Sequence, residues 1–75
     1  MAPPEGRHLV KRSLSLAGHR TSIALEPAFW AVLEEAAAER GRSLAALVAA
    51  LDAERAPSVP LASALRVFAL GARRG

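Results

Sequence analysis

The stretch KRSLSLAGHRTSIALEP, residues 11–27, alternates apolar and polar side chains on both sides of a Gly-His pair and ends at a proline. A period of two is typical of a half-buried strand, because successive side chains point to opposite faces of a sheet. The alternation therefore predicts two strands, each with a core face and a solvent face. The predicted core face carries Leu14, Leu16, Thr21, Ile23 and Leu25, and the predicted solvent face carries Lys11, Ser13, Ser15, Arg20, Ser22 and Ala24.

The Gly18-His19 pair predicts a two-residue hairpin turn of type II′, which favours glycine at its first central position. A two-residue turn brings the two apolar faces together, whereas a three-residue loop would set leucines opposite Ser22 and Arg20. The predicted register sets Leu16 opposite Thr21, Leu14 opposite Ile23, Arg12 opposite Leu25, Ser15 opposite Ser22 and Lys11 opposite Glu26.

Pro27 indicates the start of a helix, since proline is favoured at the first helical position and cannot donate to a strand ladder. The apolar spacing that follows predicts a helix over residues 27–40, with Gly41 as its C-terminal stop. We expect its two aromatic side chains, Phe29 and Trp30, to lie in the core. Ser43 is in place to cap a second helix over residues 44–55.

The segment APSVP, residues 56–60, breaks the chain, and apolar spacing resumes over residues 61–72 as a third, shorter helix. We expect three parts: a flexible basic arm (1–10), a folded domain (11–56), and a C-terminal helix with a basic tail (57–75). We recognise no internal repeat.

Charge is unevenly distributed along the 75 residues, whose net charge is +3. Residues 1–20 hold four basic side chains against one acidic, residues 21–56 hold three against six, and residues 57–75 hold three against none. Basic ends make a nucleic acid a plausible partner. A chain this short buries only about 60% of the surface that it exposes when unfolded, which favours a partner subunit.

The order of these elements resembles the ribbon-helix-helix family of bacterial DNA-binding proteins. The resemblance lies in residues 20–51: an alternating strand, a proline-started helix, and the turn and helix ERGRSLAALVAAL. The longer pattern, from VKRSLSLAGHRTSIALEPAFW to SALRVFAL, looks like a subfamily of short ribbon-helix-helix domain proteins from alphaproteobacteria. The resemblance implies an α+β fold, with a strand or hairpin, two core helices and a short C-terminal helix, in an intertwined homodimer.

In that family, strands from two chains form a β-ribbon that lies in the major groove of DNA. Carried over by position, the resemblance implies a DNA-binding transcriptional regulator whose base-reading residues are Arg20, Ser22 and Ala24. We expect phosphate contacts from Lys11, Arg12, and the start of the second helix at Arg42, Ser43 and Leu44.

The first predicted strand departs from the family pattern. If both strands pair within one chain, a sheet-joined dimer has four strands, and three spacings of about 4.8 Å plus side chains exceed a groove about 12 Å wide. Either the first segment acts as a free arm on phosphates, or the sheet does something other than direct readout.

An alternative function is a protein-interaction module, such as an adaptor or an antitoxin-like inhibitor, on the same scaffold without sequence-specific readout of DNA. Its docking surface would be the third helix, with Leu61, Leu65 and Phe68 as anchors. The competing interpretation of that helix is a lid over the dimer core.

Enzymatic chemistry is not expected. The chain has no cysteine, no phosphate loop and no nucleophile elbow, and His19 reads as a turn residue. Glu34, Glu35 and Glu39 read as a solvated helix face. We expect no cofactor and no metal. No apolar run is long enough to span a membrane, so we expect a cytoplasmic protein without membrane partners.

Overall fold

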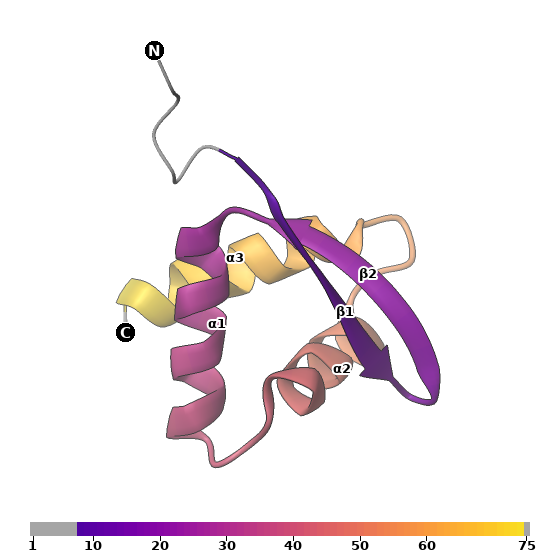
Figure 1. Cartoon of the computed structure of the whole chain (residues 1–75), viewed down its shortest axis with the longest axis horizontal. Helices are drawn as coiled ribbons and strands as arrows, with labels where there is room; N and C mark the ends of the chain where they lie inside the picture. The colour runs from indigo at the N-terminus through magenta and orange to yellow at the C-terminus, as the bar shows by residue number, and fades with distance from the viewer. Residues whose placement is uncertain (1–7, 75) are drawn as a thin grey trace.

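Two strands and three helices make up residues 8–74, the part of the chain that the computed structural model describes (Figure 1). The elements are β1 (Val10–Leu16), β2 (His19–Leu25), α1 (Pro27–Glu39), α2 (Leu44–Glu54) and α3 (Leu61–Arg74). The antiparallel hairpin β1-β2 runs along one side of the three helices. The predicted α+β order of a hairpin followed by helices is confirmed. Of the predicted arm, residues 1–7 lie outside the described residues, and its last residue, Val10, begins β1.

The hairpin turn lies one residue earlier than predicted. Its central residues are Ala17 and Gly18, both with positive φ (50° and 86°), as a type I′ turn requires. The predicted turn at Gly18-His19 is therefore wrong, and so is the register that followed from it. The observed pairs are Val10 with Leu25, Lys11 with Ala24, Arg12 with Ile23, Ser13 with Ser22, Leu14 with Thr21, Ser15 with Arg20, and Leu16 with His19.

The two-residue shift leaves every side chain on its predicted face, because the side-chain period of a strand is two. Leu16, Ile23 and Leu25 are buried on the inner face as expected. The shift does change the partners: Lys11 lies opposite Ala24 and not Glu26.

Replacing Ala17 by asparagine tests this turn. Ala17 adopts a left-handed conformation that costs a residue with a Cβ about 1 kcal/mol, and asparagine tolerates that conformation better. We expect Ala17→Asn to raise the free energy of unfolding by about 0.5 kcal/mol, measured by urea denaturation. The matched variant Ser15→Asn, inside β1, should not stabilise the protein. A turn at residues 18–19 would leave Ala17 extended, and Ala17→Asn would then give no gain.

Local hydrogen bonds define both ends of α1. The carbonyl of Glu26 accepts from the backbone N–H groups of Phe29 (3.0 Å) and Trp30 (3.2 Å), with Pro27 in the first turn. At the other end Gly41 has φ +65°, and the N–H of Arg42 donates to the carbonyl of Ala37 at 2.9 Å. This is a Schellman ending, which needs a left-handed residue where Gly41 lies.

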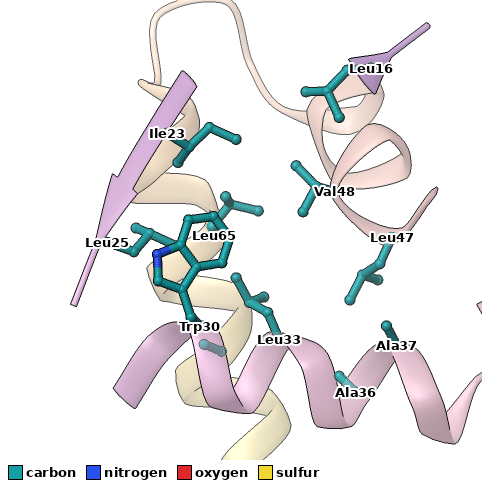
Figure 2. Packing of buried hydrophobic residues seen from close by; sticks show 11 residues of the cluster. Leu16, Ile23, Leu25, Trp30, Leu33, Ala36, Ala37, Leu47, Val48 and Leu65 are labelled. Carbon is teal, nitrogen blue, oxygen red and sulfur yellow. The ribbon is translucent and has the colours of Figure 1, made fainter. Parts of the chain in front are cut away.

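The core lies between the inner face of the hairpin and the three helices, whose buried side chains point toward one another (Figure 2). Five large side chains are almost completely buried, and they come from four elements: Leu25, Trp30, Leu33, Val48 and Leu65. Because Leu65 belongs to α3, the third helix is part of this core. The packing of α3 within one chain favours a helix that covers the core over a helix that is free to dock a partner.

Trp30 ties β1 to the helices. Its indole Nε1–H donates to the carbonyl of Val10 at 2.8 Å, and its ring is 1% exposed. At the other end of the strand Leu16 is buried in the core. The first strand is therefore paired as a hairpin and anchored at both ends, which resolves the choice between a hairpin and a free arm.

Glu26 and Arg66 join the end of β2 to α3. The guanidinium Nε of Arg66 donates to Oε1 of Glu26 at 3.0 Å. A hydrogen bond from the backbone N–H of Glu26 lowers the pKa of that carboxyl below its ordinary value of 4.5, and the bond from Arg66 lowers this pKa further. The carboxylate is therefore favoured in the folded protein.

This pair predicts a loss of stability in acid. A lowered folded-state pKa stabilises the protein fully above the unfolded pKa, and this stabilisation is lost as the pH falls through the folded value. We expect the melting temperature to fall below about pH 4.5, and Glu26→Gln to lack this part of the fall. Thermal unfolding between about pH 3 and 6 measures this dependence. Glu35→Gln is the control, because it keeps the pair of Glu26 and Arg66. Equal pH profiles for Glu26→Gln and the parent protein would contradict the prediction.

Candidate nucleic-acid interface

The outer face of the hairpin combines small hydroxyl side chains with two cations. The two-residue turn closes with a hydrogen-bonded pair at Leu16 and His19, so the outward side chains belong to the alternate, non-hydrogen-bonded pairs. All are exposed except the half-buried Ala24: Lys11, Ser13, Ser15, Arg20, Ser22 and Ala24. The face bears no carboxylate, so it is suited to an anionic surface.

Two serines occupy the centre of this face. Ser13 and Ser22 lie directly opposite each other, and their Oγ atoms are 3.2 Å apart, with either hydroxyl able to donate. Both residues are exposed. A hydroxyl can donate or accept, so this pair can meet phosphates and base edges with little selectivity.

Lys11 and Arg20 lie diagonally at opposite ends of the outer face. Lys11 is opposite Ala24 at the open end, and Arg20 is opposite Ser15 beside the turn. Among the described residues, neither cation lies within ion-pair distance of a carboxylate. Their charges therefore remain available to a ligand.

Arg12 lies elsewhere. It faces inward, where its Nη1 donates to Oε2 of Glu34 at 2.7 Å and its guanidinium lies 4.9 Å from the centre of the Trp30 ring. The structure therefore does not bring Arg12 together with Lys11. Glu34, predicted to be a solvated residue of the first helix, is exposed and also serves as the partner of Arg12.

The start of α2 is capped within the chain. The Oγ of Ser43 accepts from the backbone N–H of Ala46 at 3.0 Å, which satisfies one of the free N–H groups of the first turn. Arg42 and Ser43 are exposed and Leu44 is half-buried. The cap leaves the backbone N–H groups of Leu44 and Ala45 for an anion.

The predicted docking residues of α3 contribute to the protein's own core. Leu65 is 0% exposed, Leu61 is half-buried, and half-buried Phe68 lies with its ring centre 5.1 Å from the guanidinium carbon of Arg40. The exposed apolar residues of α3 are instead Val67 and Leu70, at 70% and 55%. Leu65 therefore has no surface to offer a partner, whereas Leu61 and Phe68 remain partly accessible.

No catalytic arrangement is evident in the part of the chain that the structure describes. Over these residues no three His, Cys, Asp or Glu side chains are grouped to hold a metal ion. His19 is exposed and is the first residue of β2, so it lies beside the turn and not within it as predicted. None of the helices within residues 8–74 has the length and apolar character needed to cross a bilayer.

The register uncovers a short repeat that we did not recognise in the sequence. KRSLSL (residues 11–16) and RTSIAL (residues 20–25) share a basic residue, a central serine, an aliphatic residue, a small residue and leucine at equivalent places nine residues apart. Aligning the two segments nine residues apart would have shown this repeat. The same alignment would have shown that Lys11 and Arg20 are equivalent. Ser13 and Ser15, not predicted as site residues, join the same face.

Comparisons with known proteins agree with this architecture. A family model described as "Ribbon-helix-helix domain" matches residues 9–72. Among solved structures the chain is similar to an uncharacterized protein from Bordetella pertussis Tohama I, with 33% identity and a TM-score of 0.77. The match covers 97% of this chain and 62% of that one, so the present chain spans less than two thirds of that protein. No curated protein sequence matches significantly.

Proposed function

The chain belongs to the ribbon-helix-helix family, and from this premise we propose that it binds double-stranded DNA through the outer face of its hairpin and regulates transcription. The observation that carries the proposal is the chemistry of that face: three hydroxyls and two cations that have no ion-pair partner within residues 8–74, without a carboxylate. The acidic side chains of the described residues lie in other elements or at the end of β2. A basic surface of this kind attracts the phosphate backbone before any base is read.

We assign the contacts by reach and chemistry. Arg20 has the length and the donors to bond guanine O6 and N7, Ser22 can donate or accept, and Ala24 offers a methyl contact to thymine. Lys11 adds positive charge to the same face, and the start of α2, with exposed Arg42, offers a phosphate site. Arg12 is not included, because its guanidinium is bound to Glu34.

A homodimer is part of the proposal. The sequence of α2, LAALVAALDAE, is apolar on almost every side, yet only Leu47 and Val48 of this helix are buried within one chain. A helix that is apolar all round is normally covered on all sides. A second copy of the chain over the remaining half-buried positions would supply that cover: Leu44, Ala45, Ala49, Ala50 and Leu51.

The experiment is fluorescence anisotropy of the protein with a mixed-sequence duplex of about two helical turns at several salt concentrations. We expect the affinity to fall by roughly 10²- to 10³-fold between about 50 and 200 mM salt, since each phosphate contact releases counterions. Arg20→Ala should weaken binding, whereas Arg73→Ala removes a charge from α3 and should have a smaller effect. An affinity that does not depend on salt would contradict the proposal.

One observation favours the alternative, a protein-interaction module. Val67 and Leu70 are exposed on α3, and apolar side chains presented by a helix are a common basis of protein recognition. This function predicts weak DNA binding that is insensitive to Arg20. It also predicts that Val67→Asp abolishes complex formation with the partner while leaving DNA affinity unchanged.

A further inference from the structure

The two strands of the hairpin are related by an approximate local two-fold axis. In an antiparallel pair, an axis perpendicular to the sheet through one pair of opposite residues exchanges the strands. Through the pair Ser13 and Ser22, the observed register exchanges residues nine apart, so Lys11 maps onto Arg20 and Ser15 onto Ala24. The outer face of one chain thus has a basic residue at each end, on opposite strands, and two serines at its centre.

The width of the groove limits how this face can meet DNA. The major groove is about 12 Å wide and admits a two-stranded ribbon. A dimer joined through strand edges would present four strands, about 14 Å between the outermost backbones before side chains are counted. Such a sheet is too wide to enter the groove.

Removing β1 from the sheet would solve the width problem, but the core opposes it. The strand would have to give up the hydrogen bond from Trp30 to the carbonyl of Val10, the burial of Leu16, and the ion pair of Arg12 with Glu34. It would also lose its whole ladder with β2. These contacts favour an intact hairpin over a detached β1.

We propose, on the basis of the function proposed above, that the ribbon that enters the groove is the hairpin of a single chain. Lys11 and Arg20 are then equivalent reading residues, since either side chain can bond guanine O6 and N7. This arrangement requires a homodimer to form through helices and not through the sheet edge.

The geometry defines the DNA element that one hairpin takes. Lys11 and Arg20 are separated by four residue positions along the strand direction, about 14 Å, on opposite strands. This length corresponds to roughly three to four base pairs. Because the two residues are exchanged by the local axis, they face opposite DNA strands. The element is therefore a pair of guanines on opposite strands, roughly three to four base pairs apart, with the two serines over the bases between them.

The test selects bound duplexes from a pool in which about ten central base pairs are randomised, with the full-length protein, followed by sequencing. The parent protein should enrich the two-guanine element. Lys11→Ala and Arg20→Ala should each lose one of the two guanines and weaken binding to the parent-selected duplex by roughly 5- to 150-fold. Lys11→Arg should keep both guanines, and Arg73→Ala should leave the motif unchanged.

The outcomes separate this inference from the proposed function. If Lys11→Ala keeps the parent motif and weakens all duplexes equally, Lys11 contacts phosphates only and the single-chain ribbon is wrong, while DNA binding stands. If the parent protein binds no duplex in a salt-dependent way, the proposed function fails and the inference fails with it. Lys11 and Arg20 are exposed, so melting temperatures close to the parent value will confirm that the variants fold.

Discussion

Trp30→Ala is expected to lower the free energy of unfolding by about 3–5 kcal/mol, the usual cost of removing a buried aromatic side chain. The ring is almost fully buried among side chains of other elements, and its N–H holds the first residue of β1. A domain of this size has roughly 4–11 kcal/mol of stability in total. The variant should therefore lose a large share of this stability, and urea denaturation followed by circular dichroism measures the loss.

Two further variants separate the contributions of the ring. Trp30→Phe keeps most of the volume but removes the N–H donor, so the carbonyl of Val10 loses its side-chain partner. We expect it to cost about 1–3 kcal/mol. Phe29→Ala removes the neighbouring aromatic ring, which is only half-buried, and should cost less than Trp30→Ala. Equal decreases in the free energy of unfolding for Phe29→Ala and Trp30→Ala would contradict the central position of Trp30 in the core.

Leu65→Ala is expected to cost about 2–5 kcal/mol, because Leu65 has no exposed surface and its replacement leaves a cavity between α3 and the core. Val67→Ala, two residues further on the same helix, removes an exposed side chain and should change stability by less than about 0.5 kcal/mol. Urea denaturation of the two variants side by side measures the difference.

The contrast between these two positions tests the role of the third helix. A small effect of Leu65→Ala would mean that α3 does not pack on the core, and Leu65 would then be free to serve as the docking anchor that the sequence suggested. A large effect shows that α3 completes the core of each chain. The hairpin then has a folded support within one chain, as the single-chain ribbon requires.

In the hairpin, the local sequence pattern predicted the strands and their faces but not the register. Alternation identified both strands and assigned their faces correctly, because it reflects the period of the pleat. It did not identify the register, because a shift by two residues keeps every apolar side chain inside. The choice depended on the turn, where Ala17 adopts a positive φ that residue statistics disfavour. Only the assembled sheet reveals that conformation.

The partners of the Arg12 side chain could not be predicted from the sequence pattern. Next to Lys11 in the sequence, Arg12 was predicted to share a role with that residue. Its side chain instead faces inward and meets Trp30 and Glu34, which are 18 and 22 positions away. Such a partnership depends on how α1 packs against the sheet, and no local periodicity encodes it.

The sequence by itself determined the elements whose causes are local. These are the alternating strands, the helix start at Pro27, the stop at Gly41 and the cap at Ser43, each of which depends on φ preferences and hydrogen bonds within a few residues. The tertiary structure alone decided which cations of the described residues lack an ion-pair partner, that Trp30 holds β1, and that Leu65 lies in the core. The physical reason is that each of these depends on contacts between residues far apart in the chain, which form only when the elements pack together.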